Sequence, residues 1–149
     1  MEKARWDCKP NVAYSTLVYV DETDEKALEV AKARAARAYT GFLPPREGDE
    51  TFEELLEKYV ETYRRRGDLK TIETRLKIFD ADYLVGNDIV FIGSPETVAP
   101  KLKEASTTGT FNTFMGEFNC SDLEEEDLMR SIRLFGERVI PALKDHEPF

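Results

Sequence analysis

The chain has 149 residues, 41% hydrophobic and 11% aromatic, which is enough for one globular domain with a sizeable core. Thirty acidic residues against 21 basic ones give a formal net charge of −9, which disfavours nucleic acid and anionic membranes as partners. No apolar run approaches the length of about 18 residues that spans a bilayer, and the first residues lack the apolar core of a signal peptide. We therefore expect a cytoplasmic protein.

The cysteines and the histidine predict no metal site. Cys8 and Cys120 are far apart and show no Cys-x-x-Cys spacing, so both are expected to be free thiols. The only histidine, His146, stands close to the end of the chain, which is a poor place to hold a general base. Catalytic residues therefore stay unassigned.

The first predicted element is a strand over residues 12–20. Its nearly continuous run of β-branched and aromatic residues is typical of a strand buried on both faces, as in a parallel sheet. Acidic residues at 21–24 then favour a helix start, and helical spacing predicts a helix over residues 24–41. The residues expected to face the sheet are Leu28, Ala31, Ala35, Ala38 and Phe42. A strand followed by a helix indicates an α/β fold.

Residues 44–88 interrupt this alternation. After a loop, Thr51 and Glu54 form a capping box that opens a helix ending at Gly67. A second helix begins at Asp68 and is predicted to end near residues 80–82. We interpret residues 44–88 as a helical insertion within a single domain of residues 1–149. It is either a lid over an active-site mouth or a hairpin that only packs.

The alternation then resumes with a short strand at residues 89–92. Ser94 is a predicted N-cap and Pro95 a first helical residue, and the helix runs to Gly109 with a kink at Pro100. Val98 and Leu102 are its expected buried positions.

A strand over residues 110–118 and a final helix complete the chain. Ser121 and Glu124 form a predicted capping box, and Pro141 is expected to end the helix. The expected buried stripe is Leu128, Ile132, Phe135 and Val139. The acidic run 124–127 complements the helix dipole, so it needs no divalent cation to explain it.

This succession resembles the C-terminal end of the bacterial-luciferase-like flavin monooxygenases. The most similar stretches are Gly-Ser-Pro-Glu at 93–96 and Phe-Gly-Glu-Arg-Val-Ile-Pro at 135–141. Residues 12–42 resemble strand and helix six of that family, 82–102 the entry to helix seven, and 109–143 strand and helix eight. The resemblance implies a (β/α)8 TIM-type barrel, which needs about 250 residues. We therefore expect a partial barrel of about three βα units with the helical insertion.

The resemblance also implies a function: oxidation of a small molecule such as an aldehyde or alkane by O2, with reduced FMN or a deazaflavin as cofactor. The catalytic histidine and most flavin-binding residues of the family lie on the first five strands, and nothing in residues 1–11 replaces them. The chain is therefore expected to be inactive alone, as the C-terminal portion of such an enzyme. The alternative is a non-catalytic, dimerising or flavin-binding remnant of the family.

Three residues are candidate flavin contacts by this resemblance. Ser15 is expected to face the flavin ring or substrate, although a strand serine can also bond only to backbone. Tyr39 lies beside the place where relatives carry an aromatic residue, with Ala38 at the aligned position. Ser94 and the N–H groups after it could hold a phosphate, or Ser94 could serve only as a helix cap. Further candidates on or just after the last strand are Asn112, Glu117 and Asn119, and Glu117 could either orient a ligand or simply meet solvent.

A partial barrel is expected to associate, because it leaves two sheet edges and one apolar inner face uncovered. The partner is either a second copy of the chain or a separately encoded N-terminal barrel half. An expressed fragment of a longer enzyme and a degenerate relative are the remaining possibilities.

Overall fold

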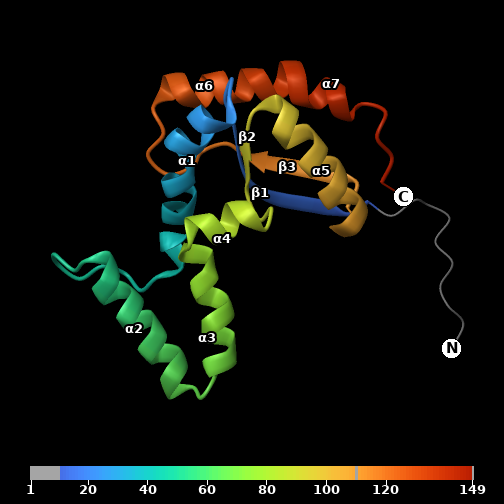
Figure 1. Cartoon of the computed structure of the whole chain (residues 1–149). Helices are drawn as coiled ribbons and strands as arrows, with labels where there is room; N and C mark the ends of the chain where they lie inside the picture. Colours follow the sequence, from blue (N-terminus) through green and yellow to red (C-terminus); the bar gives the residue numbers. More distant parts are fainter. Residues whose placement is uncertain (1–10, 110, 149) are drawn as a thin grey trace, which may run out of the picture.

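The computed structural model describes residues 11–109 and 111–148. Within them, a parallel sheet is formed by β1 (Ala13–Val20), β2 (Phe91–Gly93) and β3 (Thr113–Glu117). The α-helices are α1 (Asp24–Ala38), α2 (Phe52–Arg65), α3 (Leu69–Leu76), α4 (Ala81–Gly86), α5 (Pro95–Gly109), α6 (Glu125–Leu134) and α7 (Ile140–Leu143) (Figure 1). Short 3-10 turns follow α1 at Tyr39–Phe42 and α3 at Lys77–Phe79, and a π-helical turn at Phe135–Val139 joins α6 to α7. The predicted α/β class with a parallel sheet is confirmed.

β1, the first strand among the described residues, is the central one, because the sheet order is β2-β1-β3. Consecutive units of a (β/α)8 barrel would instead place their strands in chain order. The two connections run in opposite directions, from β1 out to β2 and from β2 back across β1 to β3. Right-handed crossovers that run in opposite directions place their helices on opposite faces of a sheet. The observed layers follow this rule.

Helices cover both faces of the sheet. On one face, Leu17 and Tyr19 pack against Ala27, Ala31 and Ala35 of α1, which are fully buried. The predicted packing face is confirmed at Ala31 and Ala35, while Ala27 was not predicted. The other face is covered by α5, by α6 and by the π-helical turn. The buried residues of that second core are Val18, Val20, Phe91, Val98, Ala99, Leu102, Leu134, Phe135 and Val139.

The neighbours of β1 are staggered along it. β2 pairs with residues 18–20 and β3 with residues 13–17, so no residue of β1 pairs on both sides. Polar side chains bond to some of the backbone groups that lack a partner strand. Thr16 Oγ1 donates to the carbonyl of Ile89 at 2.5 Å, and Ser131 Oγ of α6 accepts from Val20 N–H at 2.8 Å. The carboxyl half of β1 is buried, whereas Ala13 and Ser15 are exposed.

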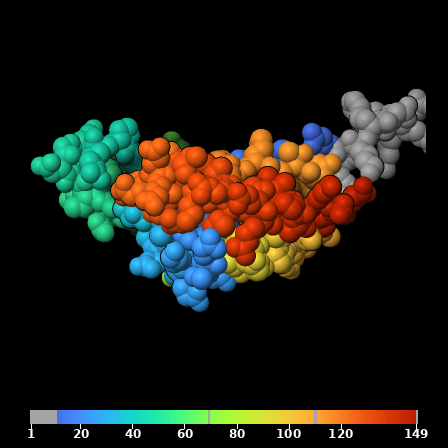
Figure 2. Space-filling model, turned by 90° about the horizontal axis from the view of Figure 1, so that it is seen from above, coloured from blue at the N-terminus to red at the C-terminus, as the bar shows by residue number. Residues whose placement is uncertain are grey.

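The predicted insertion forms a projecting arm. Helices α2 and α3 make a hairpin that extends away from the sheet (Figure 1) and occupies one end of the elongated molecule (Figure 2). The capping box of Thr51 and Glu54 is confirmed, and Gly67 closes α2 with φ of 74°. The helix α4 was not predicted. Asp80 is its N-cap and accepts from the N–H groups of Asp82 and Tyr83, so the acids expected to end one helix begin another.

The end of the chain differs from the prediction at two points. Ser121 has φ of 62° and cannot be an N-cap, so α6 starts at Glu125 without the predicted capping box. Pro141 does not end the helix, because it lies inside α7. The wider π-helical turn directly before it accommodates a residue that donates no backbone N–H. The helix α5 contains Pro100 and runs to Gly109, as predicted.

Two expected stripes are only partly buried. Phe42 and Ile132 are 62% and 40% exposed, and Ala38 also faces solvent, whereas Val98 and Leu102 are buried as predicted. In residues 11–109 and 111–148, no helix combines the length and apolar character that crossing a bilayer would require.

Candidate functional site

Two of the predicted residues, Ser15 and Tyr39, lie toward the same part of the sheet, around Glu117. Ser15 on β1 is exposed and its Oγ donates to Glu117 Oε1 on β3 at 2.7 Å. The strand register explains this contact, since Leu17 pairs with Glu117 and Ser15 projects from the same face two residues earlier. Ser15 therefore has a side-chain partner and does not bond only to backbone.

Tyr39 reaches this region from the end of α1. Burial raises the pKa of its hydroxyl, the Thr16 side chain lowers it in part, and the negative charge of Glu117 adds to the rise. Its ring stacks against Phe42 with centroids 6.2 Å apart and planes 16° from parallel. We call Ser15, Tyr39, Phe42, Met115 and Glu117 the open-face group.

The thiol nearest to the open-face group is not a nucleophile. Cys120 is fully buried and free, as predicted, while Cys8 lies outside the described residues. Burial and the nearby charge of Glu117 raise the pKa of Cys120 to about 11. The reactive thiolate is therefore scarce at neutral pH.

Ser94 lies at the opposite end of the sheet. It follows β2, whose last residue Gly93 pairs with Val20. The five-residue separation of Ser15 and Val20 along β1 corresponds to about 16 Å. The structure does not bring Ser94 together with Ser15 and Tyr39.

A carboxylate of this chain already occupies the N-terminus of α5. Asp24 Oδ1 accepts from Ser94 N–H at 2.6 Å, and its Oδ2 accepts from Thr97 Oγ1 at 2.8 Å. These hydrogen bonds lower the pKa of Asp24. Gly93 permits the close approach, because a Cβ there would lie 2.9 Å from Asp24 Oδ1. A flavin phosphate does not fit at this helix end, because it would meet the negative charge of Asp24.

Asn112 and Asn119 do not extend the open-face group. Asn112 Oδ1 accepts from Val12 N–H at 2.9 Å and so holds the chain before β3 against β1. Asn119 is exposed in the turn after β3, where its carbonyl accepts from Ser121 N–H. These residues therefore provide an exposed surface around Ser15 and Glu117 but no anion-binding cradle.

A buried ionic network closes the carboxyl edge of the sheet. Asp21 is 0% exposed and receives hydrogen bonds from Arg130 at 2.9 and 3.2 Å, from Tyr19 at 3.1 Å and from Glu22 N–H at 2.7 Å. Burial alone raises the pKa of Asp21, but these bonds and the charge of Arg130 outweigh it and hold the pKa below 3.8. Burial, then the charge of Asp21, raises the pKa of Tyr19 to about 12. The network stabilises charge but offers no proton donor or acceptor near neutral pH.

A serine and histidine pair was missed by sequence reasoning. Ser106 Oγ lies 2.7 Å from His146 Nε2 beside a cavity of about 160 Å³ lined by Phe111, Phe114 and Leu143. Ser106 Oγ also lies 2.9 Å from the carbonyl of Lys103, which competes with His146 for its single hydroxyl proton. This pair anchors the end of the chain on α5; it is not an activated nucleophile.

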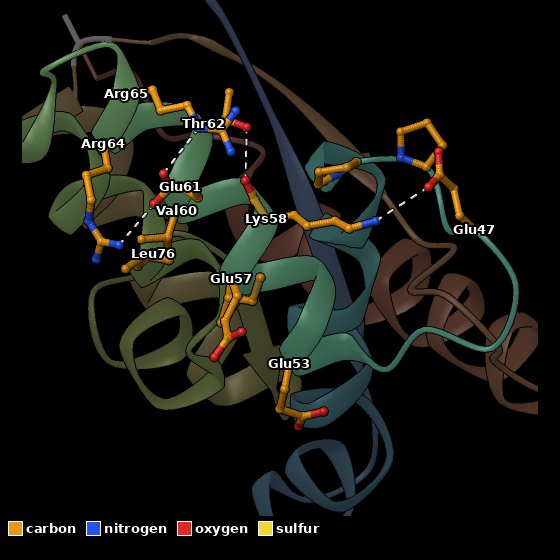
Figure 3. A pocket seen from close by; sticks show the side chains of 13 residues that line it. Glu47, Glu53, Glu57, Lys58, Val60, Glu61, Thr62, Arg64, Arg65 and Leu76 are labelled. Carbon is orange, nitrogen blue, oxygen red and sulfur yellow. Dashed lines mark hydrogen bonds and ion pairs between the residues drawn. The ribbon is translucent and has the colours of Figure 1, made fainter.

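A depression of about 1060 Å³ follows the outer face of α2 (Figure 3). Acidic and basic side chains alternate along it and pair with one another: Glu61 binds Arg64 and Arg65 at 3.1 and 3.2 Å, and Lys58 lies 3.6 Å from Glu47. It is an open surface with four glutamates and three basic residues, without converging catalytic groups.

The described ranges contain no cluster of three or more His, Cys, Asp or Glu residues arranged to hold a metal ion. Of the candidate site residues predicted from the sequence, Ser15, Tyr39 and Glu117 belong to the open-face group. No protein-family model matches the chain, and no curated protein matches it in a sequence search.

Proposed function

We propose that this chain is a non-catalytic association module, a remnant of the luciferase-like type, whose sheet is extended by a second copy of the chain. The observation that carries the proposal is the outer edge of β3: within the described residues β3 pairs with β1 alone. Beside that edge, Met115 is 51% exposed. The strand order β2-β1-β3 is a reason to prefer this module to a preassembled segment of a barrel.

The edge of β3 suits pairing with itself. Residues 113–117 contain no lysine or proline that would block edge pairing. An antiparallel pair centred on Met115 would place the two Met115 side chains together about a two-fold axis. Each Glu117 would then lie opposite Thr113 of the second copy, so the two carboxylates would not face each other.

Static light scattering tests this proposal. We expect wild-type protein to show twice the chain mass of 17.1 kDa. Met115→Lys is expected to give monomers, because two lysines would meet at the centre of the pair. Met129→Lys on α6 is the matched control, since Met129 is 50% exposed but lies away from the sheet edge. A wild-type monomer at the highest soluble concentration would disprove the proposal. A complex with a separate polypeptide in place of a dimer would favour a missing barrel half.

The second candidate is the C-terminal portion of a luciferase-like flavin monooxygenase, within a partial (β/α)8 barrel. The observation in its favour is that Ser15 and Tyr39, both expected to contact FMN or a deazaflavin, gather around Glu117. In this alternative the rest of the barrel supplies the phosphate site and the chemistry of aldehyde or alkane oxidation. The buried free thiol of Cys120 agrees with a cytoplasmic location for either candidate.

Titration with FMN and with reduced FMN distinguishes the two candidates. For the association module we expect no saturable change in flavin absorbance or fluorescence at high micromolar flavin. Saturable binding by wild type that is weakened by Ser15→Ala and Tyr39→Phe would support the flavin-dependent alternative. Tyr83→Phe is the matched control, because it also removes one hydroxyl but lies on α4 against Lys77.

A further inference from the structure

We propose that the cavity between the end of α1 and the base of the α2–α3 arm binds a small aromatic carboxylate. The cavity has a volume of about 780 Å³ and is separate from the open-face group. Binding sites for small molecules typically have volumes of about 300–1,000 Å³ and mostly apolar walls with few polar groups. This cavity has that composition.

Apolar and aromatic groups form the walls. Phe52 of α2 and Phe79 after α3 meet edge to face, with ring centroids 6.1 Å apart and planes at 72°. Leu43 and Leu55 are buried behind them, while Phe52 keeps 36% of its surface exposed. A flat aromatic ligand would cover the exposed part of Phe52 and offer the ring contacts that such side chains favour.

The charge of the lining selects an anion. The chain carries a net charge of −9, yet the described residues that line this cavity include Arg37 and Arg46 and no aspartate or glutamate. Arg46 forms no ion pair with a described residue within 4 Å, although the pKa of Glu50 in the same loop is lowered by a hydrogen bond from Lys58 and also by the charge of Arg46. Arg37 Nη1 is 3.6 Å from Asp122 Oδ2, a carboxylate shared with Arg34. A guanidinium group binds a carboxylate through paired hydrogen bonds.

The comparison with the depression along α2 supports this choice. There, arginines and lysine are paired with glutamates of the same surface (Figure 3). In the cavity at the base of the arm, positive charge stands beside aromatic walls without an acid in the lining. The ligand class that complements both features is an aromatic ring bearing one carboxylate.

Calorimetric titration with 2-naphthoate, and with the uncharged 2-naphthamide, tests the proposal. We expect saturable binding of naphthoate and at least about tenfold weaker binding of the amide, the factor that one charge-assisted hydrogen bond supplies. Arg37→Met with Arg46→Met is expected to weaken naphthoate binding about tenfold or more. Arg64→Met with Arg65→Met is the matched control, since it removes the same charge from the outer face of α2.

Filling the cavity provides an independent test. A Cβ at Gly41 meets no atom within 4 Å, so Gly41→Leu can place its side chain in the cavity and is expected to abolish binding. Gly86→Leu, also without a neighbour within 4 Å, is the control on α4 and should bind normally. Ala36→Leu blocks the cavity from α1 if Gly41→Leu fails to fold. Equal affinity for the acid and the amide, unchanged binding by the blocking variants, or no binding at millimolar naphthoate would overturn the proposal.

Discussion

Replacing Asp21 with asparagine is expected to lower the free energy of unfolding by about 2–3 kcal/mol, because Arg130 loses its buried charged partner and, among the described residues, keeps only Asp127. The side chain is fully buried, and Arg130 reaches it with two hydrogen bonds. Urea unfolding measures the change. Glu22→Gln is the matched control: it removes a neighbouring carboxylate whose ion pair with Arg138, at 3.2 Å, is exposed, and should cost about 1 kcal/mol or less.

The same network predicts how stability depends on pH. The pKa of Asp21 in the folded protein lies below its ordinary value of 3.8, so its contribution is complete above the unfolded-state pKa. The contribution declines as pH falls from that value through the folded-state pKa. The difference in stability between wild type and Asp21→Asn should therefore be largest near neutral pH and shrink below about pH 4. A constant difference down to pH 2 would show that Asp21 is not held ionised by the fold.

Phe91→Ala is expected to destabilise the fold by about 3–5 kcal/mol through lost burial and the cavity left behind. Phe91 is 0% exposed at the centre of the second core, and its ring meets that of Phe114 edge to face at 5.7 Å. Urea unfolding should show a lower midpoint with little change in the denaturant slope.

Two variants calibrate this result. Phe91→Leu keeps most of the apolar volume and should cost less than about 2 kcal/mol. Phe42→Ala makes the same chemical change at a side chain that is 62% exposed. It should lower the free energy of unfolding by much less than Phe91→Ala does. If Phe42→Ala and Phe91→Ala were equally destabilising, β2 would not form the core contact described here.

The two proposals concern separate parts of the chain: the open-face group lies beside the edge proposed for dimer formation, and the cavity at the base of the arm is the proposed ligand site. Met115 and Glu117 lie beside a free strand edge, where a second copy can pair. Arg37, Arg46 and Phe52 surround a cavity that faces the arm. Because the cavity lining includes no residue of β1 or β3, dimer formation and naphthoate binding can be tested by different variants.

Local sequence signals predicted many of the elements but not their neighbours. The capping box of Thr51 and Glu54 and the turn at Gly67 are confirmed, because each depends on residues within one turn. The predicted box at Ser121 is wrong, since the left-handed conformation of Ser121 comes from the turn after β3. Phe42 and Ile132 have helical spacing but no element packed over them, so the stripe alone overstates their burial.

For the candidate site, too, the sequence predicted individual residues but not which of them lie together. Sequence resemblance predicted Ser15, Tyr39 and Ser94 as one set, whereas the structure separates Ser94 from the other two. Nothing near Ser94 in sequence indicates that Asp24, seventy positions earlier, caps its helix. A carboxylate following a buried strand was the available signal for Asp21, but its partner Arg130 lies 109 positions away.

The sequence by itself determined the α/β class, the parallel character of β1 and most helix starts, because hydrophobic periodicity and capping act over a few residues. Only the tertiary structure decided that β1 is central, that helices cover both faces and that Asp24 occupies the start of α5. These features depend on contacts between residues far apart in the chain, which local propensity and spacing do not encode. The cavity beside Phe52 and Phe79 is of this second kind, since its walls come from separate helices and loops.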